Sequence, residues 1–191
     1  MTYEIERATD RVIRSLYSDG NPNKAVLSSA RGAASMTNRR AQGVWPIMLA
    51  NLDAKFLSRT GQPTHAEVAV YSAIHFYAIH QQGKTQFVYG PANQTDETKG
   101  KTLFSALADL RKNEKTRTAL DRRVQPLLAT TNVNSVINSI EHLVEILKAS
   151  NWEQKIDYAR LAQDLYRFQG SYEQANSVRL LWGQQYFKAI D

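Results

Sequence analysis

The sequence contains no cysteine. Disulfides, thiol nucleophiles and thiolate metal sites are therefore excluded. No apolar run reaches the roughly 18 residues that a membrane-spanning helix needs. The chain starts with the acidic segment MTYEIE, which lacks the apolar stretch of a signal peptide. These absences predict a cytoplasmic protein with no membrane partner.

Motifs for catalysis and for metal or cofactor binding are also missing. The four histidines are His65, His75, His80 and His142. Their spacing contains no His-x-x-x-His pair, and the sequence has no Gly-x-Ser-x-Gly motif. The segment Gly100-Lys101-Thr102 matches the last three residues of a phosphate-binding P-loop motif. That motif also needs a glycine five positions earlier, where this chain has Thr95. We therefore predict no catalytic residues, no metal and no cofactor.

Positive charge is concentrated in two segments of the chain. The net charge is +6. Residues 20–43 carry four basic and no acidic side chains, and residues 99–123 carry eight basic against three acidic ones. The remaining residues have a net charge of −3. This focusing is typical of a surface that binds a polyanion, although basic helices are also often solvated faces without a ligand.

Apolar residues recur at helical spacing along most of the chain, which predicts an all-α fold. We expect an irregular bundle of about eight or nine helices. A long loop over residues 84–101 would join two small lobes, residues 1–83 and 102–191, of a single helical domain. A loop of this length is often functional or disordered.

Several positions have the spacing of helix starts. These are Thr64 with Glu67, Ser171 with Gln174, and Asp157 alone. Asn21-Pro22 predicts a further start, with proline in the first helical position, for a helix that runs to about Arg31. A third helix is expected to hold Trp45 to Phe56.

One aromatic residue is a candidate ligand for an unpaired base. Most tyrosines and phenylalanines have core spacing, but Tyr89 lies in the predicted loop with Lys84, Lys99 and Lys101 around it. A loop tyrosine flanked by lysines suits base stacking. Tyr89 could therefore stack on an unpaired base, a role that needs an accessible ring.

Four segments in the C-terminal half appear in a recognisable order. They are GKTLFSALA at 100–108, DRRVQPLL at 121–128, IDYARLAQDL at 156–165 and VRLLWGQQYF at 178–187. Together they resemble the CasB family, the small subunit of the type I-E CRISPR interference complex Cascade. The chain departs from the family where a Leu-Arg-Arg is usual: Ser28-Ser29 and Glu141-His142 stand there instead.

The resemblance implies an all-helical subunit without catalytic activity. Family members lie as two copies head to tail in Cascade, contact the other subunits, the guide RNA and the target DNA backbone, and help to hold the displaced DNA strand. Such contacts are independent of sequence because the guide reads the target. The departures imply weaker strand holding than in a typical relative.

The basic segments and the resemblance together name the candidate nucleic-acid-binding residues. They are Arg31, Arg39, Arg40, Lys99, Lys101, Arg111, Lys112, Lys115, Arg117, Arg122 and Arg123. The alternative is a free-standing helical DNA-binding regulator, which needs a recognition helix for the major groove. The sequence has no helix–turn–helix pair with the usual short glycine turn. A helical enzyme with dispersed residues is a third, weaker reading.

Overall fold

The computed structural model describes residues 3–150 and 153–188, and nine α-helices lie within them. The helices are α1 (Glu4–Ser15), α2 (Lys24–Arg31), α3 (Trp45–Asn51), α4 (His65–Gln81), α5 (Leu103–Arg111), α6 (Glu114–Ala129), α7 (Val133–Ala149), α8 (Tyr158–Phe168) and α9 (Tyr172–Phe187). The predicted all-α fold is confirmed. In the part described, β structure is limited to a two-stranded hairpin and isolated bridges.

Helix α4 forms the centre of the molecule. Every residue from Ala69 to Gln81 is buried, so the helix is enclosed on all sides. Helices α1, α2, α7 and α8 pack around it. The capping box of Thr64 and Glu67 starts the helix as predicted.

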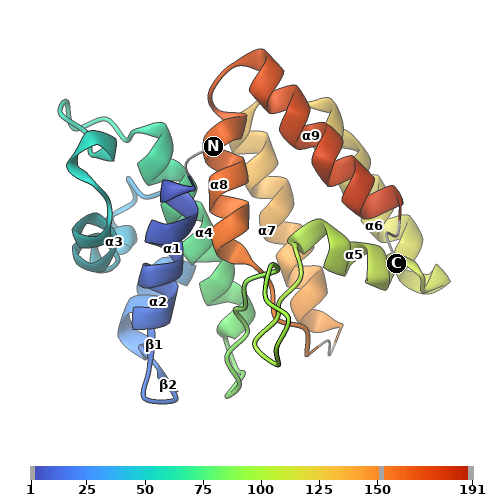
Figure 1. Cartoon of the computed structure of the whole chain (residues 1–191), viewed down its shortest axis with the longest axis horizontal. Coiled ribbons are helices and arrows are strands. Elements are labelled where there is room, and N and C mark those ends of the chain that lie inside the picture. The colour runs from blue at the N-terminus through green and yellow to red at the C-terminus, as the bar shows by residue number, and fades with distance from the viewer. Residues whose placement is uncertain (1–2, 151–152, 189–191) are drawn as a thin grey trace.

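Helices α5, α6 and α9 extend this arrangement on the other side of α7 and α8, while α3 packs on α1 and α4 (Figure 1). Helix α9 packs on α5, α6 and α8, while α6 also packs on α7. Helix α8, from the C-terminal half, packs on both α1 and α4. The buried apolar residues from both halves of the chain form one continuous core. The division into two lobes at residues 84–101 stays a prediction.

The predicted helix start at Asn21-Pro22 is wrong. Strands β1 (Tyr17–Ser18) and β2 (Asn21–Pro22) form a hairpin instead. Its two turn residues, Asp19 and Gly20, have φ angles of 52° and 76°, which suits an Asp-Gly turn between paired strands. Helix α2 starts two residues later than predicted, because the side chain of Asn23 accepts the backbone N–H of Val26.

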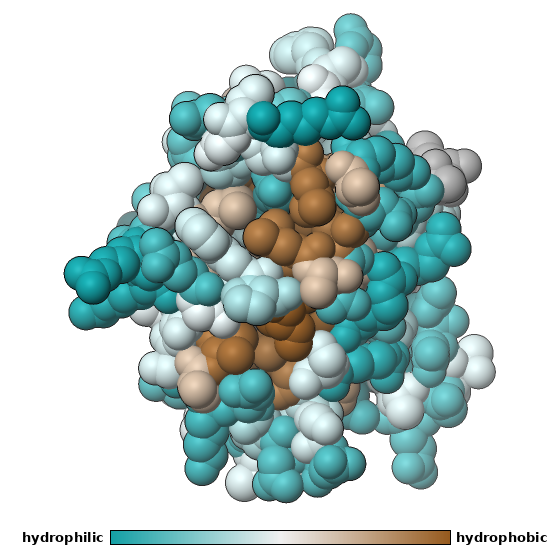
Figure 2. All heavy atoms as spheres, turned by 90° about the vertical axis from the view of Figure 1, so that its left-hand side faces the viewer, coloured by the Kyte–Doolittle hydropathy of each residue, from teal (hydrophilic) through white to brown (hydrophobic). Residues whose placement is uncertain are grey.

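The predicted helix from Trp45 to Phe56 is divided. Helix α3 ends at Asn51, because Leu52 and Asp53 adopt extended backbone conformations. A short 3₁₀ turn, η2 (Ala54–Phe56), follows. A second one, η1 (Arg39–Gly43), precedes α3 and was not predicted. Figure 2 shows the side of the molecule that carries α3, where apolar side chains gather between polar ones.

The long loop predicted over residues 84–101 is present and is tied down at its base. Ile156 lies between its two ends and pairs with Tyr89 and Lys101 through parallel bridges. Gly90 and Gly100 approach so closely that a Cβ atom on Gly100 would lie 1.9 Å from the carbonyl oxygen of Gly90. A side chain at Gly100 is thus sterically excluded, and the loop is held closed there.

Candidate nucleic-acid interface

Helices α5 and α6 carry most of the predicted binding residues. Thr102 caps α5 and Asn113 caps α6, each by accepting a backbone N–H of the first turn. The Gly100-Lys101-Thr102 segment is thus the start of a capped helix. Leu120, Val124 and Leu127 bury one face of α6 and leave its other faces to solvent.

Arg111 is occupied by contacts within the protein. Its Nε donates to Oδ1 of Asp121 over 2.8 Å, and its Nη2 donates to Oδ2 over 3.2 Å. The guanidinium also lies 5.4 Å from the ring centroid of Tyr186 and 5.1 Å from that of Phe187. The hydrogen bond with Asp121 raises the pKa of Arg111 and lowers that of the carboxyl group. Arg111 therefore joins α5, α6 and α9.

Asp109 engages two more of the candidates. Its Oδ2 lies 2.5 Å from Nζ of Lys101, and its Oδ1 lies 2.9 Å from Nζ of Lys112. These three residues line a pocket of about 370 Å³ together with the exposed Lys99 and Lys188. One carboxylate faces four ammonium groups there, so the pocket stays positive while two of its lysines are held in place.

The outer faces of α6 present three exposed cations. Lys115, Arg122 and Arg123 are exposed, and no side-chain hydrogen bond or ion pair joins them to the described residues. At 100° per residue, Lys115 and Arg122 lie on nearly the same face, opposite the buried stripe and about 10 Å apart along the axis. Arg123 lies to one side of that face. Arg117 is exposed too, but its Nε donates to the carbonyl oxygen of Arg111.

The second group of predicted residues lies on another part of the molecule. Arg31 ends α2, while Arg39 and Arg40 start η1. Arg39 and Arg40 are exposed, and no side-chain ion pair joins either to the described residues. Helices α2 and α6 stand on opposite sides of the molecule in Figure 1, with α4 and α7 between them. The structure therefore places the candidates in two separate groups.

Both departures from the family pattern have a structural setting. Ser29 packs against Gly43, where a Cβ atom would lie 2.5 Å from the serine Oγ. Glu141 points toward buried His75, with 3.4 Å between Oε2 and Nε2. The other nitrogen of His75 lies 2.7 Å from the carbonyl oxygen of Ala30. The side chains at 29 and 141 therefore belong to helix packing.

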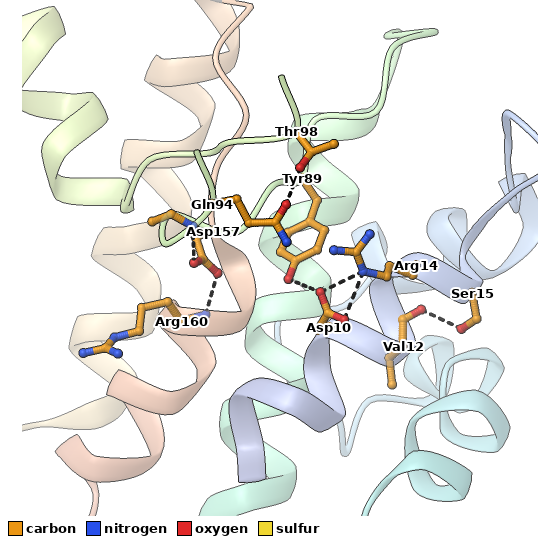
Figure 3. Close-up of polar contacts among 10 residues, drawn as sticks. Asp10, Val12, Arg14, Ser15, Tyr89, Gln94, Thr98, Asp157 and Arg160 are labelled. Atoms are coloured by element: carbon orange, nitrogen blue, oxygen red, sulfur yellow. Dashed lines mark hydrogen bonds and ion pairs between the residues drawn. The ribbon is translucent and has the colours of Figure 1, made fainter. Parts of the chain in front are cut away.

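The expectation that Tyr89 is an accessible stacking residue is wrong. Its ring is buried, and its hydroxyl donates a hydrogen bond of 2.5 Å to Asp10 on α1 (Figure 3). Burial, strengthened by this hydrogen bond, raises the pKa of Tyr89 well above the usual range. Arg14 pairs with the same carboxylate. Tyr89 therefore fastens the loop to α1, a role that its lysine neighbours in the sequence did not suggest.

Two lysines that no pattern in the sequence indicated contribute to the positive field near Arg31. Lys84 follows α4 and Lys148 lies near the end of α7, both outside the two basic segments. Burial lowers the pKa of Lys148, and the charges of Arg31 and Lys84 each lower it further. The three residues come from separate elements, so no local pattern in the sequence connects them.

The described residues contain no group of three or more His, Asp or Glu side chains that could hold a metal ion. The buried histidines serve packing: His80, for example, is hydrogen-bonded to Tyr158 through Nδ1 at 2.9 Å. Within residues 3–150 and 153–188, each helix is too short or too polar to cross a bilayer.

These observations define a class: an all-α protein with two separate basic surfaces. The family model for the CRISPR-associated protein Cse2 matches residues 23–187, so the chain belongs to the Cse2 family. Cse2, or CasB, is a family of Cascade subunits, and the resemblance predicted from the sequence is confirmed.

One solved structure is similar over nearly its whole length. The crystal structure of CasB from Thermobifida fusca matches with a TM-score of 0.70 and 23% sequence identity, covering 97% of this chain and 98% of that one. At this identity the likeness supports the fold alone. No curated protein sequence matches the chain.

Proposed function

We propose that this protein is a non-catalytic subunit that binds the backbone phosphates of guide RNA and target DNA within Cascade and stabilises the R-loop. The observation that carries the proposal is the outer surface of α6. Lys115, Arg122 and Arg123 are exposed there and are not paired with any described side chain. Cations held ready on a rigid helix suit contacts with phosphate.

The chemistry of this surface favours binding without sequence preference. Lysine and arginine contacts with phosphate position a nucleic acid but carry no sequence information. In a guided complex, base pairing supplies the specificity, so backbone contacts are sufficient. The alternative, a free-standing regulator, would need base-reading side chains on a recognition helix. Membership of the Cse2 family supports the Cascade subunit.

The proposed partners follow from the weakness of a small basic surface. A few phosphate contacts give a Kd of roughly 10⁻⁴–10⁻⁶ M at physiological salt. The proposed partners are the other Cascade subunits and a second copy of this protein, arranged head to tail. Once the protein is docked on them, its further contacts with the nucleic acid are intramolecular, which supplies avidity. We propose that the surface outside the two basic segments, net −3, faces those subunits.

Fluorescence anisotropy with labelled oligonucleotides of two unrelated sequences, single- and double-stranded, tests the binding mode. We expect weak binding of all four, with log K falling linearly with log salt concentration at about 0.7 per contact on single strands and about 0.9 on duplexes. Strong preference for one sequence, with little dependence on salt, would favour the regulator instead. No binding of any strand would contradict the proposed contacts.

A further inference from the structure

A pocket of about 480 Å³ lies at the end of the molecule that carries the β1–β2 hairpin. Lys24 and Arg31 of α2 line it, together with Lys84, with Gln81 at the end of α4 and with Gln82, which follows that helix. Pockets of 300–1,000 Å³ are typical of small-ligand sites. The space is larger than a lone oxyanion needs.

The charges around this pocket repel one another. Lys148 of α7 adjoins it, because its Nζ donates to Oε1 of Gln82 over 2.8 Å. Burial lowers the pKa of Lys148, and Arg31 and Lys84 lower it further. Glu145 acts in the opposite direction, but it is exposed and lies 3.3 Å from His142. The positive field also reaches His80: burial lowers the pKa of this histidine, and the charges of Lys84 and Lys148 lower it further.

Among the described residues that line this pocket there is no carboxylate, in contrast to the pocket beside α5. In that pocket Asp109 binds two lysines and lowers the net charge. Here three elements far apart in the sequence place cations around one hollow. Cations that are held close together repel one another and raise the free energy of the folded protein, unless a bound anion offsets the repulsion.

We propose that this pocket binds a phosphate of a nucleic-acid strand, with Arg31 and Lys148 as its main cationic contacts. The inference rests on the proposed function, since it names a second contact region for the same partner. Arg31 supplies a planar fork of donors that matches phosphate, and lysine supplies a point charge. The buried Leu27 and the half-buried Pro22 give the pocket an apolar part, against which the attached sugar can pack.

The test compares two double variants of the full chain. Arg31→Gln with Lys148→Gln removes the proposed contacts. Arg7→Gln with Arg59→Gln removes the same charge from exposed sites elsewhere. Arg59 follows Ser58, which donates to Glu67 in the first turn of α4. The pocket lies at the other end of this 17-residue helix, about 25 Å away.

Affinity for a labelled single strand is measured against salt by fluorescence anisotropy. The loss of one phosphate contact lowers the slope of log K against log salt concentration by about 0.7. At 0.1 M salt this corresponds to an affinity that is about fivefold lower. We expect this loss in the Arg31/Lys148 variant and little change in the control. Lys84→Gln alone should give a smaller loss in the same direction. Circular dichroism establishes that each variant is folded.

Three outcomes would overturn the inference. Equal losses in both double variants would mean that net charge alone matters. Protection of Lys148 from amine acetylation by inorganic phosphate, but not by the oligonucleotide, would assign the pocket to a free anion. Loss of binding in Arg122→Ala/Arg123→Ala but not in Arg31→Gln/Lys148→Gln would refute this site and leave the proposed function standing. Failure of the wild-type chain to bind any strand would instead refute the proposed function itself.

Discussion

Arg111 and Asp121 form a two-pronged ion pair that joins the end of α5 to α6, with Nε–Oδ1 and Nη2–Oδ2 distances of 2.8 and 3.2 Å. Ten residues separate them in the sequence. Two nitrogen atoms of the Arg111 guanidinium are used in this pair, so Arg111 serves a structural role. Arg122, which directly follows Asp121 in the DRR segment, has a different one. Arg122 points to solvent, while Asp121 fastens the helix on which Arg122 stands.

This difference predicts opposite effects of substitution. Arg122→Ala/Arg123→Ala should weaken DNA binding while the free energy of unfolding stays within about 0.5 kcal/mol, as is usual at exposed sites. Arg111→Ala should instead lower that free energy by about 1–2 kcal/mol, because Asp121 and Tyr186 lose a charged partner. Urea unfolding and anisotropy measure the two effects on the same samples.

The control for this experiment should be Arg7→Gln/Arg59→Gln. Lys148 and Lys188 would be unsuitable control sites. Lys148 adjoins the pocket near Arg31. Lys188 lines the pocket that also contains Lys99. If the control loses as much affinity as the Arg122/Arg123 variant, net charge explains binding and the assignment to α6 is wrong.

A second prediction concerns Trp182 and Asp164, which belong to two of the segments that resemble the CasB family. The indole Nε1 of Trp182 donates a hydrogen bond of 3.1 Å to Oδ2 of buried Asp164. Trp182→Phe should therefore lower the free energy of unfolding at pH 7 by about 1–3 kcal/mol, the cost of a lost donor to a buried charge plus reduced packing. The loss should be smaller at pH 5, where Asp164 is largely protonated. Urea titrations at both pH values check this, and an equal loss at both would contradict it.

The ionisation of Asp164 itself gives a third prediction. Burial raises the pKa of Asp164 to about 6, above its ordinary value of 3.8. The folded state therefore binds a proton more readily than the unfolded chain, and this group adds stability as the pH falls from 7 to 5, by about 1.3 kcal/mol. Asp164→Asn should lack that gain. The comparison needs unfolding free energies of both proteins across this range, and parallel curves would show that Asp164 has an ordinary pKa.

Buried His80 should act in the opposite direction, which is the fourth prediction. Burial, together with the positive charges of Lys84 and Lys148, lowers the pKa of His80 to about 3 from 6.5. The unfolded chain then binds the proton more readily, so stability falls as the pH drops below 6.5, by about 2 kcal/mol between pH 7 and 5. His80→Gln should lose less stability than wild type over this interval. A greater loss in the variant would rule out the neutral buried histidine.

How far the sequence predicted this molecule depends on the range of the interactions. Capping residues such as Thr64 and Asp157 act within one turn, so local spacing located the helices that they start. The hairpin at Asp19-Gly20 was missed because an adjacent Asn-Pro pair suits a helix start equally well. Tyr89 was misjudged because its partner, Asp10, lies 79 residues away.

The predicted site residues show the same limit. Composition located both basic segments, since charge is visible without a structure. It did not show that Asp109 and Asp121 engage Lys101, Lys112 and Arg111. Nor did it bring Lys148 to Arg31, because that proximity arises only when α7 and α2 both pack on α4.

The last prediction concerns the lifetime of the R-loop. Cascade reconstituted with this chain should hold its target longer than Cascade without it, because contacts made on a rigid complex are intramolecular and each slows dissociation. The Arg122→Ala/Arg123→Ala chain should shorten the lifetime while still entering the complex, and the Arg7→Gln/Arg59→Gln chain should leave it unchanged. The lifetime of the R-loop is measured by single-molecule dissociation experiments at two salt concentrations. The comparison separates these cases, because phosphate contacts make the lifetime depend on salt. If omission of the chain leaves the lifetime and the target affinity unaltered, R-loop stabilisation is not its function, and the exposed cations of α6 need another explanation.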